Sequence, residues 1–127
     1  MKKTIYPTFE EALYLHDLLI KKFGGQPGIR DKGLLESALY RPQSGYYETL
    51  SEQAAALMQS LAMNHCFVDG NKRIAFALTA TFLLLNGYNL KASADEGEGF
   101  LIKEIIQKKV SVQEIANWIE HHLKKNG

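Results

Sequence analysis

Cysteine and proline are scarce in this chain of 127 residues, which has one Cys and three Pro. Because Cys66 is the only cysteine, an intrachain disulfide is excluded, and we expect a cytoplasmic location. Long hydrophobic runs are also missing. The longest, residues 74–85, includes two threonines and is too short to span a bilayer. Residues 1–7 lack the apolar run of a signal peptide, so we expect no membrane association.

Excess charge is the third absence. The chain has 15 basic and 14 acidic residues, a formal net charge of +1. A dedicated nucleic-acid-binding domain is usually strongly basic, so a DNA-binding regulator is disfavoured and no direct nucleic-acid contact is expected. A hydrophobic content of 46% is typical of a folded globular protein. The length favours a single domain over residues 1–127.

Hydrophobic residues recur at helical spacing along most of the chain, and no segment shows convincing strand alternation. Capping signals predict the helix starts, at Thr8 with Glu11, Asp31, Ser51, Asp95 with Glu98, and Ser111 with Glu114. The sequence therefore predicts an all-α fold, a compact bundle of about six helices.

Three helices carry further expectations. The fourth, starting near Asn71, is apolar nearly all round, which is typical of a helix in the middle of a bundle. The sixth is expected to hold two histidines and two lysines in its last turns, where cations suit the helix dipole: His121, His122, Lys124 and Lys125. His16, on the first helix, is more typical of a partly buried structural histidine than of a functional one.

The loop between the third and fourth helices gathers polar groups, in the stretch His65-Cys66-Phe67-Val68-Asp69-Gly70-Asn71-Lys72-Arg73. Lys72 and Arg73 lie in the first turn of the fourth helix, where the macrodipole favours anions. Gly70 allows close backbone approach and Asn71 adds a side-chain donor. Free N–H groups at this end would complete a phosphate-type anion site. The alternative is a capped helix whose Lys and Arg point into water.

The same loop has the residue types that phosphoryl transfer to a hydroxyl requires. The imidazole of His65 is suited to accept a proton near neutral pH, so it is the candidate base. Asp69 is the candidate ligand for Mg²⁺, a cation that prefers oxygen ligands. Arg73 could pair bidentately with phosphate and Lys72 would act as a point charge. A hydrolytic zinc on His65 and Asp69 is disfavoured, since no third ligand is obvious nearby.

The pattern His-x-Phe-x-Asp-Gly-Asn-Lys-Arg resembles the signature of the Fic/Doc superfamily. Lys72 at its eighth position, the short chain and residues 24–31 resemble the Doc (death-on-curing) toxin branch. The resemblance implies an all-α bundle with the active loop between helices three and four. Family members transfer part of a nucleoside triphosphate to a protein hydroxyl, and most transfer AMP and have a small residue where Lys72 stands.

Differences from the AMP-transferring Fic enzymes favour the Doc branch. Phe76 stands where those enzymes usually have a second Arg, and Cys66 where Pro is common. No Ser/Thr-x-x-x-Glu-Gly-Asn inhibitory motif is found, and residues 93–97 match it poorly, so inhibition is expected from another chain. Doc toxins are paired with a Phd-like antitoxin, whose docking groove we expect along helices one and two. The type member phosphorylates a threonine of elongation factor Tu.

We therefore expect a toxin of a type II toxin-antitoxin system that blocks translation. It would transfer the γ-phosphate of ATP, with Mg²⁺, to a Ser/Thr hydroxyl of a protein target, elongation factor Tu by resemblance. The expected catalytic residues are His65, Lys72 and Arg73, the phosphate ligands are Gly70, Asn71, Lys72 and Arg73, and the metal ligand is Asp69. The alternatives are AMP transfer to a protein hydroxyl and a non-catalytic anion-binding module.

Overall fold

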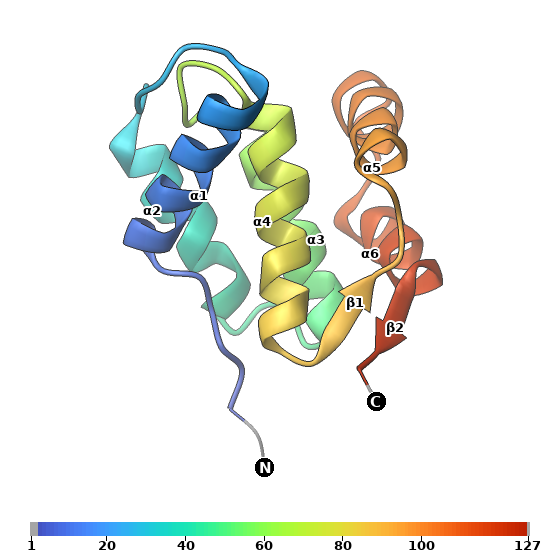
Figure 1. Cartoon of the computed structure of the whole chain (residues 1–127). Coiled ribbons are helices and arrows are strands. Elements are labelled where there is room, and N and C mark those ends of the chain that lie inside the picture. Colours follow the sequence, from blue (N-terminus) through green and yellow to red (C-terminus); the bar gives the residue numbers. More distant parts are fainter. Residues whose placement is uncertain (1–2, 127) are drawn as a thin grey trace.

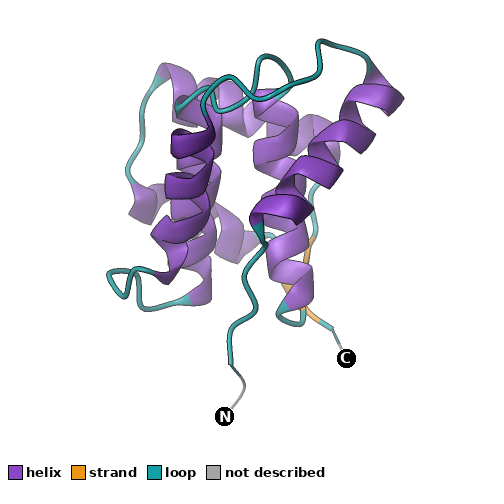
Figure 2. Cartoon of the chain, turned by 90° about the vertical axis from the view of Figure 1, so that its left-hand side faces the viewer, coloured by secondary structure: helices purple, strands orange, loops and turns teal. Residues whose placement is uncertain are grey.

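Six α-helices form most of the computed structural model, which describes residues 3–126. The α-helices are α1 (Phe9–Phe23), α2 (Lys32–Tyr40), α3 (Leu50–Met63), α4 (Asn71–Leu85), α5 (Ala94–Phe100) and α6 (Val112–His121). Figure 2 shows that helices make up most of the fold, that loops join them and that the strands are very short. The predicted helical bundle is therefore confirmed. The predicted domain limits include Met1, Lys2 and Gly127, which lie outside the described residues.

Side-chain caps explain where most of these helices begin. The predicted capping boxes of Thr8 with Glu11 and of Ser111 with Glu114 are present, and Asp31 caps α2.

Two predicted helix starts are wrong. Thr49 with Glu52 caps α3, and Ser93 with Glu96 caps α5. In each case a complete Ser/Thr-x-x-Glu box lies two residues before the predicted start and satisfies two backbone N–H groups at once. Ser51 instead lies inside α3, where its hydroxyl donates to Glu120 of α6.

The prediction of no strands is also wrong. Strands β1 (Tyr88–Leu90) and β2 (Leu123–Lys125) form an antiparallel pair. Three-residue strands are too short to show a two-residue alternation, so periodicity could not reveal them. Because α6 ends at His121, the two terminal lysines Lys124 and Lys125 lie in β2 rather than in the last helical turn.

Two short segments complete the helical part. A 3₁₀ turn, η1 (Arg41–Gln43), extends α2 across Pro42, and the wider π-helical segment η2 (Leu101–Gln107) continues α5. Glycine makes the packing of α5 possible, because a Cβ at Gly97 would lie 2.1 Å from the ring of Phe76 on α4. No helix among residues 3–126 is long and apolar enough to cross a bilayer.

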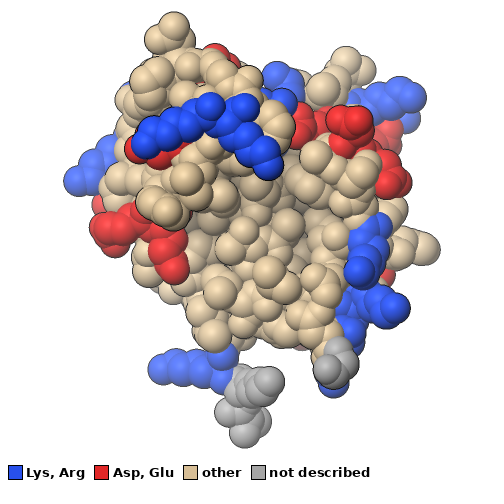
Figure 3. Space-filling model, in the orientation of Figure 1, with Lys and Arg blue, Asp and Glu red and all other residues tan. Residues whose placement is uncertain are grey.

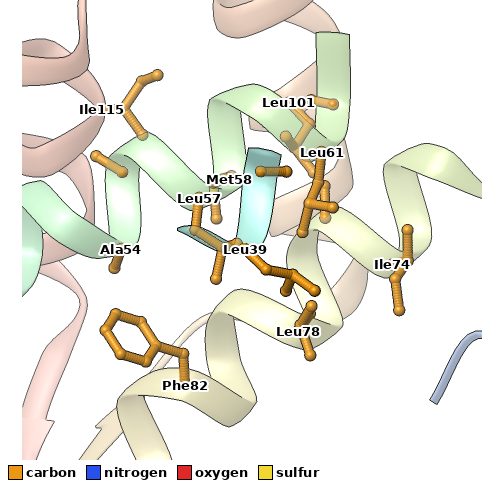
Figure 4. Close-up of a cluster of buried hydrophobic side chains, with 14 of the residues drawn as sticks. Leu39, Ala54, Leu57, Met58, Leu61, Ile74, Leu78, Phe82, Leu101 and Ile115 are labelled. Atoms are coloured by element: carbon orange, nitrogen blue, oxygen red, sulfur yellow. The ribbon is translucent and has the colours of Figure 1, made fainter. Parts of the chain in front are cut away.

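Helix α3 lies in the middle of the fold, between α4 and α6, and Figure 4 shows its Leu57, Met58 and Leu61 in the core. All three side chains are fully buried, and each stabilises the fold by roughly 1.5–3 kcal/mol relative to exposure. The prediction that α4 lies in the middle holds for its inner face only, since Leu84 and Leu85 are 53% and 40% exposed. The outer face of α4 is therefore apolar and uncovered.

Two connections meet at one end of the bundle, the α1–α2 connection and the loop from α3 to α4 (Figure 1). Both chain ends lie at the opposite end. The polar loop singled out in the sequence is thus held between α1, α2, α3 and α4.

Candidate active site

The loop of residues 64–70 is fixed along its backbone by the α1–α2 connection. The N–H groups of Arg30 and Asp31 both donate to the carbonyl of Cys66, at 2.8 and 3.0 Å. One turn further, the N–H of Val68 donates to the carbonyl of Gly28 at 3.0 Å. The two segments therefore meet as a short backbone ladder, which positions the loop relative to α1 and α2.

The side chain of Arg30 holds the start of the loop. Its Nε donates to the carbonyl of His65 at 2.6 Å, and its Nη2 donates to the carbonyl of Asn64 at 3.1 Å. His65 itself has a φ of 49°, a left-handed backbone conformation that is uncommon outside glycine. Strained residues of this kind cluster at functional sites. The imidazole is exposed at the loop surface, where a substrate can reach it.

The carboxylate of Asp69 is held by two backbone donors. The N–H of Gln26 donates to Oδ2 at 3.1 Å, and the N–H of Gly70 donates to Oδ1 at 2.8 Å. The Gln26 hydrogen bond, followed by that of Gly70 and by the nearby His16 and Lys72, lowers the pKa of Asp69. A Cβ on residue 25 would come within 2.8 Å of Oδ2, so glycine is required there.

This geometry fits a magnesium ligand. An ionised carboxylate has about four lone-pair positions, so two hydrogen bonds leave room for a cation at Asp69. Hard cations of this kind are usually held by one or two carboxylates together with phosphate oxygens and water. Among residues 3–126, no three His, Cys, Asp or Glu side chains cluster as they would around a metal ion.

His16 is a structural histidine, in line with the expectation from sequence. Its ring is only 3% exposed and stacks on Phe67 with a centroid separation of 3.8 Å. Its Nε2–H donates to the backbone carbonyl of Asp69 at 2.8 Å. Helix α1 thus holds the loop through this contact, and His16 positions Asp69 rather than facing solvent.

The side chain of Asn71 closes the loop on itself. Its Oδ1 accepts the N–H of Phe67 at 3.0 Å, and its Nδ2 donates to the carbonyl of Phe67 at 2.9 Å. Asn71 therefore fixes the shape of the loop with one Nδ2–H, while its second Nδ2–H and its backbone N–H have no hydrogen bond among residues 3–126. The expectation that this residue contacts a phosphate stays a prediction.

The N-terminus of α4 differs from those of the other five α-helices. Each of those has a side-chain cap, whereas α4 begins after Gly70, whose φ of 75° is left-handed. Among residues 3–126, no oxygen accepts the N–H groups of residues 71, 72 and 73. Three free donors at the positive end of a helix dipole form an anion site.

The two cations of the first turn have different surroundings. Lys72 is exposed and has no ion pair among residues 3–126. Arg73 lies 4.3 Å from the ring centroid of Phe23, and its Nε is 3.6 Å from Glu98 on α5. The Arg73–Glu98 pair is long and about one third exposed, so an incoming anion can compete for the guanidinium.

Sequence reasoning missed two of these contacts. Arg30 was part of the Doc-like segment, but nothing in the pattern indicated that its side chain holds the loop. Glu98 was predicted as a capping residue rather than as the partner of Arg73. Cys66 is inside the loop but is buried, and burial, together with the charge of Asp31, raises the pKa of its thiol, so it is not a nucleophile.

Comparison with known proteins supports the resemblance seen in the loop. The sequence model of the Fic/DOC family matches residues 6–83, which include α1, α2, α3, the whole loop and all but the last two residues of α4. The chain is 51% identical over 78 residues to "Toxin Doc" of Mycolicibacterium smegmatis, with 58% of this chain and 60% of that protein covered. It is 38% identical over 82 residues to "Protein kinase doc" of Escherichia phage P1, with 61% and 65% covered. In both comparisons the chain spans less than two thirds of the relative's length.

Proposed function

Because the chain belongs to the Fic/DOC family, and to its Doc branch, we propose that it transfers the γ-phosphate of ATP to a Ser/Thr hydroxyl of a protein. The names of the two relatives described above, a toxin and a protein kinase, support this proposal. We further propose that it is the toxin of a type II toxin-antitoxin system and that it acts in the cytoplasm. By resemblance, its target is elongation factor Tu, and the modification blocks translation.

The uncapped N-terminus of α4 is the observation that carries the proposal. Three free N–H groups and two cations converge where the other α-helices have a capping oxygen. A phosphate group offers the acceptor oxygens and the negative charge that this end lacks. The alternative, a capped helix whose cations point into water, loses support because no side chain caps the helix and Arg73 pairs with Glu98.

The proposed reaction uses the exposed side chains of the loop. The hydroxyl oxygen of the target attacks the γ-phosphorus, the bond from that phosphorus to the β,γ-bridging oxygen breaks, and ADP leaves. His65 accepts the hydroxyl proton as general base. Asp69 would hold Mg²⁺, which supplies charge neutralisation between the phosphates. Lys72, Arg73 and the free backbone N–H groups of residues 71–73 bind the phosphate oxygens.

Two observations favour γ-phosphoryl transfer over the alternative, AMP transfer. Lys72 is an exposed residue in the first turn of α4, and a side chain of this length would take up space that a glycine would leave open. Phe76, at the place of a second family arginine, packs on Gly97 of α5 rather than facing the loop. The second phosphate clamp of the AMP-transferring enzymes is therefore replaced by a hydrophobic contact.

An apolar groove offers a place for the antitoxin. A groove of about 390 Å³ lies between α1 and α4 and includes Tyr14 and Leu18, which are 68% and 44% exposed. Figure 3 shows that this face has a wide area without charged residues. We propose that an amphipathic antitoxin segment binds here, which shifts its expected position from helices one and two to α1 and α4. Leu18→Lys should prevent antitoxin binding; unchanged binding would exclude this groove.

A paired labelling assay tests the transfer reaction. The protein is mixed with Mg²⁺, a bacterial lysate and ATP labelled at either the α- or the γ-phosphate. We expect one protein band with the γ label only. His65→Ala should abolish that band while ATP binding, measured by titration, is retained. The mass of the band identifies the target, with elongation factor Tu as the first candidate.

The other results separate the alternatives. A band with the α label would establish AMP transfer, and Lys72→Gly should then not change the transferred group. No band with either label, for the lysate or for purified elongation factor Tu, would favour a non-catalytic anion-binding module. A labelled band that persists in His65→Ala would remove His65 from the role of base.

A further inference from the structure

A second pair of cations surrounds a pocket just before the loop. The pocket has a volume of about 290 Å³ and is lined by Arg41, Gln59, Ser60, Met63, Asn64, Ile105 and Lys109. Its wall ends at Asn64, the residue that precedes His65, and none of the phosphate ligands proposed above lines it. Two of the seven lining residues are cations and none is a carboxylate, so the pocket favours a negatively charged ligand.

Arg41 is fixed in this pocket by neutral acceptors. Its Nη1 donates to the side chains of Gln59 and Ser60, both at 2.9 Å, and to the carbonyl of Ala56 at 3.3 Å. Its Nε donates to the hydroxyl of Tyr47 at 2.9 Å. The guanidinium is half-buried, yet no carboxylate pairs with it among residues 3–126. A partly buried cation without a counter-charge is costly, and a bound anion would remove that cost.

The Nη2 group of the Arg41 guanidinium is still free to bind an anion. Arginine has five N–H donors in a fixed planar arrangement. The four hydrogen bonds above use Nε and Nη1, and Nη2 has no hydrogen bond to any residue from 3 to 126. Gln59 uses its oxygen for Arg41, which leaves its amide N–H₂ group as a further donor at the pocket wall.

Lys109 completes the cationic lining in an unusual way. It follows the end of η2 with a φ of 54°, at a position where glycine is the residue usually found after a helix. Its neighbour Lys108 pairs with Glu104 at 3.1 Å, whereas Lys109 has no ion pair among residues 3–126. The chain thus keeps a strained lysine where a glycine would cost less, and that lysine lines the pocket.

We propose that this pocket is a second anion site, which binds one oxyanion group, a phosphate or a carboxylate, beside His65. Its volume of about 290 Å³ lies just below the usual range for ligand sites, roughly 300–1,000 Å³, so it suits a single charged group rather than a whole nucleotide. The site is distinct from the N-terminus of α4, and it does not depend on the transfer reaction.

Titration with inorganic phosphate and, separately, with acetate tests this site by NMR. Binding in the pocket should shift the side-chain amides of Gln59 and Asn64 and the backbone amide of Lys109. Binding at α4 should shift the amides of residues 70–73, so the two sites are read independently in the same spectra. If phosphate binds more tightly than acetate, the ligand of the pocket is a phosphate group. If acetate binds more tightly than phosphate, the ligand is a carboxylate of a protein partner.

Lys109→Gly is the informative variant, because it removes the cation and relaxes the backbone at the same position. It should weaken phosphate binding in the pocket about three- to tenfold and leave the melting temperature equal or higher. Lys108→Ala, one residue away, is the matched control and should leave the affinity unchanged. The proposal is overturned if the Gln59 and Asn64 amides show no saturable shift, or if Lys109→Gly binds phosphate as well as the wild type.

Discussion

The two sides of the loop are built differently. On the side of α1 and α2, the loop is held by short hydrogen bonds from Arg30, His16 and the backbone of residues 26–31. On the side of α5, the only polar contact to the loop region among the described residues is the 3.6 Å pair between Arg73 and Glu98. One side fixes geometry, and the other allows a side chain to change partners.

This difference assigns separate tasks to neighbouring residues. Asn71 and the backbone of Asp69 are committed to internal hydrogen bonds, so they keep the loop in shape. His65 and Lys72 are exposed, and Arg73 is only loosely paired, so these three remain available to a ligand. A preorganised loop with a few free side chains is what accurate positioning of a reacting group requires.

Breaking the hydrogen bonds that fix the shape of the loop itself should have the largest effect. Asn71→Ala removes both hydrogen bonds to Phe67 and leaves a part-buried N–H and carbonyl unpaired. We expect unfolding to become easier by about 2 kcal/mol and the rate of γ-phosphate transfer to fall by about 10²-fold or more. Thermal unfolding and the labelling assay measure the two effects.

Asn117→Ala is the matched control for this change. Asn117 is exposed on α6, and its side chain accepts only from Gln113. It should change stability by less than about 0.5 kcal/mol. If Asn71→Ala behaves like this control in both measurements, the loop is not held by Asn71 and the comparison between the two sides loses its main support.

Breaking the Arg73–Glu98 pair on the side of α5 should have a smaller effect, and it should improve ligand binding rather than impair function. Glu98→Gln keeps the size of the side chain but releases Arg73 from its carboxylate partner. ATP should then bind about two- to fivefold more tightly, because the competing pair contributes at most about 1 kcal/mol. Glu104→Gln, which breaks the Lys108 pair on η2, is the control. An unchanged or weaker affinity in Glu98→Gln would show that Arg73 does not take part in binding.

Much of the fold could be read from local signals. The capping boxes at Thr8 and Ser111 depend on residues within one turn, so the sequence alone predicts them. The starts of α3 and α5 were misplaced because two candidate caps lie close together. The strand pair could not be predicted, since it forms only where α4 and α6 bring distant segments together.

For the site too, local sequence signals predict the functional stretch but not its distant contacts. The residue types and spacing of the loop predicted a functional stretch, and the missing cap at Gly70 is visible in the sequence. The partners of these residues lie far away in the chain. Glu98 is 25 positions after Arg73, and His16 is 53 positions before Asp69. No local pattern reports such contacts, so the division into a tight and a loose side required the structure.

The smallest predicted effect concerns pH on the tight side. The pKa of Asp69 is lowered in the fold, first by the N–H of Gln26 and then by that of Gly70. The ionised form therefore adds stability above the unfolded pKa of about 3.9, and that stability is lost as the pH falls through the lower folded pKa.

The melting temperatures of the wild type and Asp69→Asn should differ at pH 6 and converge below the folded pKa of Asp69. Asp17→Asn, whose carboxylate has no hydrogen bond or ion pair among residues 3–126, should show no such convergence. A difference that persists at the acid end would mean that the charge of Asp69 contributes nothing to the hold of the α1–α2 connection on the loop.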